Sequence, residues 1–138
     1  MIVDANNLVL GRMATHVAKE LLKGEKEEIV NCENIVVSGS REYLIPMYTH
    51  KTKRGEPFHG PFYPRREDML VRRAIRGMLP WKEARGQAAF RNLMCYIGIP
   101  DHLNGNKFET FKDAHVSRLR KTGYMKIKEI SKGMGKRI

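Results

Sequence analysis

Residues 1–38 read MIVDANNLVLGRMATHVAKELLKGEKEEIVNCENIVVS, a sequence in which β-rich runs flank a segment with helical periodicity. Within residues 11–23, apolar side chains recur at i, i+3, i+4, i+7 and i+8, starting from Ala14. This spacing predicts an amphipathic helix with one apolar face. Gly24 follows it and is suited to end the helix in the left-handed conformation.

The β-rich runs are residues 1–4, 28–32 and 35–38. The last two do not alternate between apolar and polar side chains, which is typical of strands covered on both faces. A strand, a helix and a further strand in this order predict an α/β fold with a parallel sheet.

The chain has 138 residues, the usual size of one domain that can bury its own core. No apolar run approaches the ~20 residues that span a bilayer, and the first residues do not resemble a secretory signal. Cys32 and Cys95 lie far apart and share no metal-ligand spacing. These features favour a protein of the reducing cytosol over a disulfide-rich extracellular one.

Charge is distributed unevenly along the chain. The formal net charge is +11, and it comes from a net −2 in residues 1–50, +5 in 51–76, +1 in 77–115 and +7 in 116–138. The first third is therefore an ordinary folding unit, whereas the centre and the C-terminal segment form a positive field that attracts polyanions.

Residues 48–64, YTHKTKRGEPFHGPFYP, predict an irregular basic loop because Pro and Gly are dense there. Loops of this length are uncommon in compact domains and are usually functional or disordered. Aromatic side chains lie among the basic ones and could stack on bases. The loop contributes four candidate RNA-binding residues: His50, Lys51, Lys53 and Arg54.

The segment Arg65–Leu79 predicts a second amphipathic helix, with apolar residues on one side of the helical wheel. Five arginines lie on the opposite side: Arg65, Arg66, Arg72, Arg73 and Arg76. Gly77 and Pro80 mark its end. A further helix at residues 82–93 and a short strand at 94–97 follow, and residues 108–119 could form a last short helix.

A run of charge on a helix is usually only a solvated face, but this face carries one sign, so its side chains repel each other without a counter-ion. Arginine forms forked hydrogen bonds that match phosphate oxygens. A membrane would require an exposed apolar face, and these helices need theirs for the core. The pattern favours nucleic acid, and RNA over DNA because a basic loop and arm carry much of the charge.

Other chemistry has weaker support. The five histidines and two cysteines show no spacing typical of a zinc site, and no nucleophile-elbow motif is present. A strand, Leu10-Gly11-Arg12 and a helix resemble the start of a nucleotide-binding fold, but the glycine-rich fingerprints are missing. The alternative without nucleotide binding is a helix with a structural role whose Arg12 binds an anion. A small nucleotide-dependent enzyme stays open as the less favoured interpretation.

The segment RGMLPWKEARGQAAFRNLMCYIGIP, Arg76–Pro100, closely resembles the signature of the large-subunit ribosomal protein L-thirteen family. The Gly-Met-Leu-Pro turn matches as it stands, and Tyr96 and Gly98 follow in register. Further matches are Asp4-Ala5, Leu10-Gly11-Arg12, Ala14, Ala18-Lys19, IVNCENI at 29–35, Val37–Gly39 and Tyr48-Thr49-His50. The resemblance covers about residues 2–100 and is similar to the archaeal form of the family. Arg41 stands where bacterial members usually carry lysine.

The resemblance implies a three-layer α/β/α unit with a four-stranded, mainly parallel sheet. It also implies a non-catalytic constituent of the large ribosomal subunit that binds large-subunit ribosomal RNA, contacts neighbouring ribosomal proteins and needs no cofactor, metal or small-molecule substrate. We expect Gly11 to let the first helix begin close to its strand. Trp81 could stack on a base or pack under the turn. The basic surface extends to Lys82, Arg85 and Arg91.

Residues 120–138 predict a basic arm that is ordered only against a partner, because its apolar residues are sparse. We therefore expect one α/β domain over residues 1–119 and an arm over 120–138. The arm and the segment before it add these candidate RNA-binding side chains: Arg118, Arg120, Lys121, Lys126, Lys128, Lys132, Lys136 and Arg137. A regulator that binds messenger RNA outside the ribosome stays open as an alternative.

Overall fold

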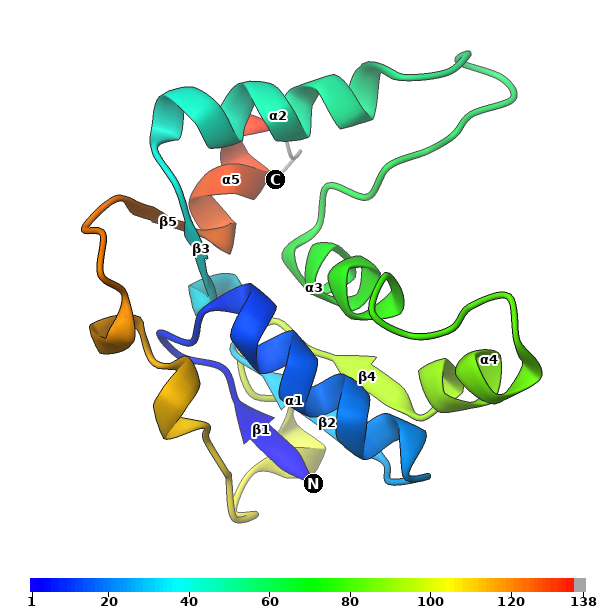
Figure 1. Cartoon of the computed structure of the whole chain (residues 1–138), viewed down its shortest axis with the longest axis vertical. Coiled ribbons are helices and arrows are strands. Elements are labelled where there is room, and N and C mark those ends of the chain that lie inside the picture. The colour runs from blue at the N-terminus through cyan, green and yellow to red at the C-terminus, as the bar shows by residue number, and fades with distance from the viewer. Residues whose placement is uncertain (136–138) are drawn as a thin grey trace.

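The computed structural model describes residues 1–135 (Figure 1). Its strands form one sheet of three strands and one ribbon of two strands. The strands are β1 (Ile2–Asp4), β2 (Glu27–Val30), β3 (Val36–Ser38), β4 (Leu93–Cys95) and β5 (Tyr124–Lys126). The helices are α1 (Leu10–Leu22), α2 (Arg41–Lys53), α3 (Glu67–Arg76), α4 (Ala84–Arg91) and α5 (Ile127–Gly133). Short 3-10 turns lie at Cys32–Asn34, Asp101–Leu103, Lys112–Ala114 and Val116–Arg118.

The parallel sheet that residues 1–38 predict is confirmed. β2 lies between β1 and β4 and pairs with both in parallel, with Val3 opposite Ile29 and Ile29 opposite Cys95. Between β1 and β2 the chain passes through α1, as parallel neighbours require a crossover. Among residues 1–135 the parallel sheet has three strands, so the four-stranded sheet implied by the family resemblance is not seen in that form.

β3 leaves the parallel sheet and pairs with β5 in the antiparallel direction, with Val37 opposite Met125. A single parallel bridge between Val9 and Val36 joins this ribbon to the start of α1. The structure is therefore a mixed α/β fold, with the β3–β5 ribbon standing above the parallel sheet (Figure 1).

Helix α1 buries most of the face that its periodicity predicts. Ala14, Val17, Ala18 and Leu21 are buried, and Gly24 ends the helix with φ of +94°. The prediction is wrong for Leu22, which is 45% exposed at the end of the helix. The helix lies against α3 and α4 and crosses in front of β2 (Figure 1). Complete burial of larger apolar side chains such as Leu21 stabilises a fold by about 1.5–3 kcal/mol each.

The prediction of a separate C-terminal arm is wrong for the described part of residues 120–138. β5 extends the ribbon with β3, and α5 packs against α2 and α3. Ile127 and Ile130 are fully buried, and Met125 and Met134 are buried with them. These four apolar residues are enough to hold β5 and α5 on the domain, because they complete a core that β3, α2 and α3 already provide. Residues 136–138 lie outside the described range.

The predicted loop at 48–64 is wrong for its first part, since α2 continues to Lys53. Pro46 lies inside this helix and removes one backbone donor there. Packing of Leu44 and Tyr48, both buried, offsets that loss. The segment between the two helices starts at Arg54, where the Gly and Pro residues begin, and runs to Arg66 before α3 (Figure 1).

Helix α3 confirms the apolar face of its prediction, with Leu70, Val71 and Ile75 buried. It begins later than expected, at Glu67, so Arg65 and Arg66 belong to the preceding segment rather than to the helix face. The short helix predicted at 108–119 is wrong: this region forms two separate 3-10 turns. In the part of the chain that the structure describes, no helix is both long and apolar enough to span a membrane.

Candidate nucleic-acid interface

Two hollows adjoin at the side chain of Phe62, between the end of α2, the following segment and α3. The first, of about 290 Å³, is lined by Lys53, Arg54 and Arg65 together with residues of the segment. The second, of about 240 Å³, is lined by Arg72, Arg73, Arg76, Phe62, Pro64, Met69 and Phe90. We call the two hollows together the basic groove. Six of the predicted RNA-binding residues thus meet on one surface.

Two arginines of the groove lie against aromatic rings. The guanidinium carbon of Arg72 is 4.2 Å from the centre of the Phe90 ring, and that of Arg76 is 4.0 Å from the centre of the Trp81 ring. The Trp81 and Phe90 rings meet edge to face at 5.1 Å. Cation–π contact of this kind fixes the guanidinium plane before any ligand arrives and leaves N–H groups free to donate.

Arg72 differs from a purely solvated side chain in a second way. Its Nε atom is buried and has no hydrogen-bond partner in the described structure. Arg73, next to it, is exposed. Of the three arginines of α3, Arg72 and Arg76 are therefore partly fixed by their contacts, whereas Arg73 is free in solvent.

The other end of the groove carries a similar contact. The ammonium of Lys51 lies 5.1 Å from the centre of the Tyr48 ring and 5.6 Å from that of Tyr63. Burial raises the pKa of both tyrosines, and at Tyr63 the charge of Arg73 acts in the opposite direction. The rings are therefore neutral and serve as a packed support for the lysine.

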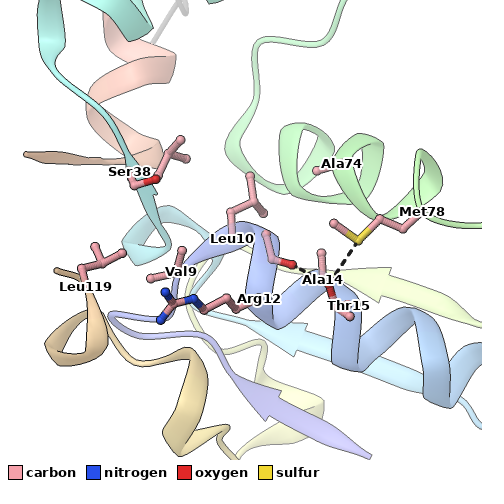
Figure 2. Close-up of a pocket in the computed structure, with 11 residues that line it drawn as sticks. Val9, Leu10, Arg12, Ala14, Thr15, Ser38, Ala74, Met78 and Leu119 are labelled. Carbon is pink, nitrogen blue, oxygen red and sulfur yellow. Dashed lines mark hydrogen bonds between the residues drawn. The ribbon is translucent and has the colours of Figure 1, made fainter. Parts of the chain in front are cut away.

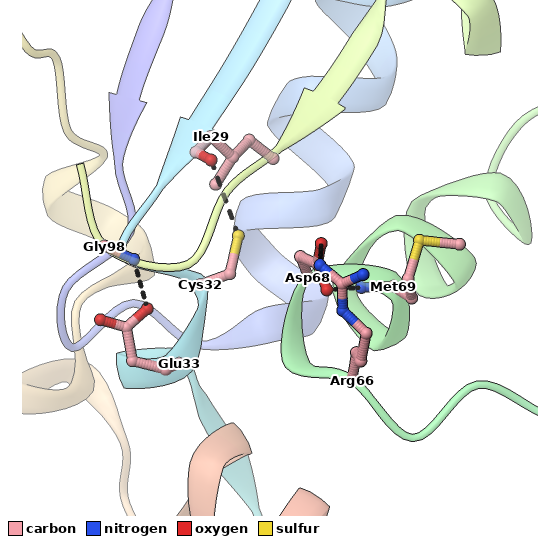
Figure 3. A network of polar contacts seen from close by, with 7 residues as sticks. All are labelled: Ile29, Cys32, Glu33, Arg66, Asp68, Met69 and Gly98. Carbon is pink, nitrogen blue, oxygen red and sulfur yellow. Dashed lines mark hydrogen bonds and ion pairs between the residues drawn. The ribbon is translucent and has the colours of Figure 1, made fainter. Parts of the chain in front are cut away.

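Some of the predicted cations are engaged in ion pairs with acids of the chain. Arg66 pairs with Asp68 at 2.9 Å, beside the turn that carries Glu33 and Cys32 (Figure 3). Arg85 pairs with Glu83 at 2.7 Å. Exposed pairs of this kind contribute about 0–1 kcal/mol, so both arginines can exchange their acid for a phosphate.

The remaining predicted residues lie outside the groove. Arg12 donates to the backbone carbonyl of Arg118 at 3.5 Å, beside a hollow of about 460 Å³ that α1, β3 and α3 line. Figure 2 shows that apolar side chains such as Val9, Leu10 and Met78 surround this hollow. Its lining lacks the polar groups that a nucleotide would need, apart from Arg12, Thr15 and Ser38.

Other candidates are dispersed over the surface. Exposed members are Arg41, His50, Lys82, Arg91, Arg120, Lys121, Lys128 and Lys132. Lys126 is half-buried at the start of α5. Lys136 and Arg137 lie outside the described residues.

The structural role expected of Gly11 is wrong. A Cβ atom at Gly11 would meet nothing within 4 Å, so α1 does not need glycine there. Gly77 follows α3 with φ of −64°, which any residue adopts. The backbones approach closely at Gly86 instead, where a Cβ would overlap the carbonyl of Pro80. Pro80 therefore belongs to a tight turn, as predicted. The helix that needs glycine for close packing is α4 and not α1.

Sequence reasoning missed Phe90 as part of the site and noted Phe62 only as one of the aromatic residues of the loop. Phe62 is 75% exposed and separates the two hollows. The aromatic content of its segment was a usable signal. Phe90 is distant in sequence from Arg72, and no local pattern shows that they meet. Trp81 packs against Arg76 and Phe90 and is 37% exposed, so the packing expected of it is seen and stacking on a base stays a prediction.

In the described part of the chain, residues with metal-binding chemistry do not gather into a second site. No group of three His, Cys, Asp or Glu residues within 1–135 could hold a metal ion. Cys32 and Cys95 are buried and free, and the Cys32 thiol lies 3.7 Å from the Ile29 carbonyl (Figure 3). A hydrogen bond with Cys95 and burial raise the pKa of Cys32, so its thiol is unreactive.

Comparison with known proteins identifies the family of the chain. The family model described as ribosomal protein L13 matches residues 1–102. The chain belongs to the ribosomal protein L13 family. It is 42% identical to the large ribosomal subunit protein uL13 of Methanopyrus kandleri, over 97% of this chain and 86% of that protein. It is 42% identical to the uL13 protein of Methanosarcina barkeri, over 99% of both chains.

A third relative, the uL13 protein of Sulfolobus acidocaldarius, is 42% identical over 98% of this chain and 93% of that protein. The family resemblance stated from the sequence motifs, and its archaeal character, are thereby confirmed. The family model ends near Pro100, but these relatives align with almost the whole chain. The segment that forms β5 and α5 is therefore shared with them.

Proposed function

We propose that this chain is a non-catalytic constituent of the large ribosomal subunit and binds large-subunit ribosomal RNA through the basic groove. The observation that supports this most directly is the convergence of Lys53, Arg54, Arg65 and the three arginines of α3 on one surface. A surface with this charge binds the phosphates of a folded RNA and releases their counter-ions. Neighbouring ribosomal proteins are its other partners, and its location is the ribosome in the cytoplasm.

The groove supplies two kinds of phosphate contact. Arg72 and Arg76 are held by rings, so their guanidinium groups lose little side-chain entropy when they bind. Arg73, Lys53 and Arg54 are exposed and can follow the local path of the backbone. The dispersed cations, including Arg12, Arg41 and Lys128, would extend the contact over a wider area of RNA.

Two features implied by the sequence belong to this proposal as well. The three-layer arrangement with a four-stranded sheet is the expected family architecture. A separate role on messenger RNA would use the same positive surface and stays a prediction. Membership of a ribosomal family favours the ribosomal role over a nucleotide-dependent enzyme.

Sedimentation tests the proposal. We expect the protein to sediment with the large subunit and to stay bound after a high-salt wash. With deproteinised large-subunit RNA, log affinity should fall linearly with log salt, with a slope that corresponds to ~6–10 phosphates. A slope near zero, or tight binding of a free mononucleotide that competes with RNA, would overturn it.

A further inference from the structure

The segment between α2 and α3 contains a short closed turn at its outer end. Glu56 and Gly60 form an antiparallel bridge. The backbone N–H of Glu56 donates to the carbonyl of Gly60 at 3.1 Å, and the N–H of Gly60 donates to the carbonyl of Glu56 at 3.0 Å. Three residues, Pro57, Phe58 and His59, stand between them. The sequence EPFHG is thus a defined turn and not an irregular stretch.

The backbone around this turn requires glycine. Gly55 and Gly60 have φ of +87° and +78°, in the left-handed region that favours glycine. A Cβ atom at Gly55 would also overlap the carbonyl of Gly60. The conformation of the turn is therefore fixed by close backbone packing.

Phe58 lies at the tip and is 89% exposed, the highest value among the exposed large apolar side chains of the described chain. His59 beside it is also exposed. An isolated apolar side chain on a surface is ordinary, but this one is displayed by a closed turn on a segment that projects away from the helices (Figure 1). Because the backbone of the turn is already fixed, it loses little freedom when the ring meets a partner.

The surroundings of the turn indicate the charge of that partner. Lys53, Arg54 and Arg65 line the hollow at the base of the segment, together with Phe62, Tyr63 and one acid, Glu56. Three cations at the base of a turn that carries an exposed ring match an anionic partner that also offers flat apolar faces. Unpaired nucleotides have both properties, because a base stacks on the ring while its phosphates meet the cations.

We propose that Phe58 is a base-stacking residue, which receives one unpaired base of the bound RNA at the tip of the Glu56–Gly60 turn. This rests on the proposed function and adds to it: the arginines of α3 bind phosphates, whereas the turn binds a base. It identifies the RNA feature at this point as an unstacked nucleotide in a loop, bulge or junction. A continuous duplex would offer no free base face here.

Substitutions that separate stacking from simple apolar contact test this. Phe58→Trp keeps a large π face, Phe58→Leu keeps apolar bulk without one, and Phe58→Ala removes both. We measure affinity for deproteinised large-subunit RNA at fixed salt. The tryptophan variant should bind like wild type, whereas the leucine and alanine variants should bind about ten-fold or more weakly.

Other outcomes have definite meanings. Equal RNA affinity of all four proteins overturns the stacking role. If Phe58→Leu binds RNA as well as wild type and is impaired only on assembly with other proteins, the tip fits an apolar protein pocket instead, and the proposal is again wrong. Thermal melting checks the fold, which an 89% exposed side chain should not affect.

The control variant is Arg73→Gln, which lies in the groove and not in the turn. If it weakens binding while the Phe58 variants do not, RNA binding stands and base stacking fails. If neither affects binding, the proposed function fails as well. Protection of a single unpaired base from a chemical probe by wild type and Phe58→Trp, but not by Phe58→Leu, would locate the contact.

Discussion

The guanidinium group of Arg76 lies against the face of Trp81, with 4.0 Å between its carbon and the ring centre. Arg72 makes the equivalent contact with Phe90 at 4.2 Å, and the two rings contact each other. Through these pairs α3 is attached to the turn before α4 and to α4 itself. The arginines of α3 therefore have unequal roles, because Arg72 and Arg76 contribute to packing and Arg73 does not.

Substitution of single arginines should reveal this difference. We expect Arg73→Gln to weaken RNA binding by about 1–3 kcal/mol, the usual value of a charged hydrogen bond, with no change in melting temperature. Arg72→Gln should weaken binding and also lower the free energy of unfolding by about 0.5–2 kcal/mol, because its cation–π contact with the ring is removed. Filter binding and thermal melting on the same samples provide the two values.

The salt dependence offers an internal control. Removal of one phosphate-binding cation should reduce the slope of log affinity against log salt by about 1. Arg73→Lys retains the charge and should keep the wild-type slope. A reduced melting temperature for Arg73→Gln equal to that of Arg72→Gln would contradict the division of roles.

The C-terminal segment should be essential for the fold. Ile127→Ala and Ile130→Ala each remove a fully buried side chain, so each should cost about 2–5 kcal/mol through cavity formation. Lys128→Ala changes an exposed residue of the same helix and is the matched control. Truncation after Leu119 should destabilise the whole protein in urea denaturation. A truncated chain with the wild-type midpoint would show that β5 and α5 are dispensable.

Two glycine substitutions should have opposite effects on stability. Gly86→Ala places a Cβ against the carbonyl of Pro80 and should destabilise the protein by about 1–3 kcal/mol, because α4 must shift away from the turn. Gly11→Ala lies in α1 with open space around it and should be neutral or stabilising by up to about 1 kcal/mol. The comparison uses the same chemical change in two helices, measured by urea denaturation. Equal effects would contradict the assigned close approach.

The parts of the fold that depend on local periodicity could be predicted from the sequence. The apolar faces of α1 and α3 follow from spacing alone, since each helix buries one side. Pairing partners could not be predicted, because β3 shows the same apolar run whether it joins β2 or β5. The burial of Ile127 and Ile130 depends on surfaces supplied by α2 and α3. A few spaced apolar residues do not show that helices distant in sequence will cover them.

For the candidate site too, local patterns could be predicted from the sequence, whereas contacts between distant elements could not. The charge pattern located the arginines of α3 and the loop, and the structure brings these arginines into one groove with Lys53 and Arg54 of the predicted loop. The ring partners of Arg72 and Arg76 come from the turn before α4 and from α4 itself, so their contact depends on how α3 and α4 pack. The end of α2 could not be predicted, because the dense Gly and Pro residues that follow it indicate a longer loop.

Glu27 is the clearest case of an acid whose environment sequence could not show. It lies on β2, is 1% exposed, and neither carboxylate oxygen has a hydrogen-bond partner within the described residues. Burial raises its pKa from 4.5 to about 7, the N-terminal amino group at 3.8 Å acts against that rise, and Glu20, Glu25 and Glu109 add to it. The folded state therefore retains a proton that the unfolded chain releases.

The stability of the protein should consequently fall as pH rises between about 4.5 and 7, because the folded state binds more protons than the unfolded state over that window. Glu27→Gln removes the titrating group, and we expect its free energy of unfolding to vary less with pH and to exceed that of wild type above pH 7, by roughly 3 kcal/mol. Glu42→Gln, on the exposed surface of α2, is the control and should keep the wild-type pH dependence. Urea denaturation at pH 5, 6, 7 and 8 measures all three proteins. Parallel curves for wild type and Glu27→Gln would show that Glu27 is ionised in the folded state at every pH tested, with the amino group compensating its burial.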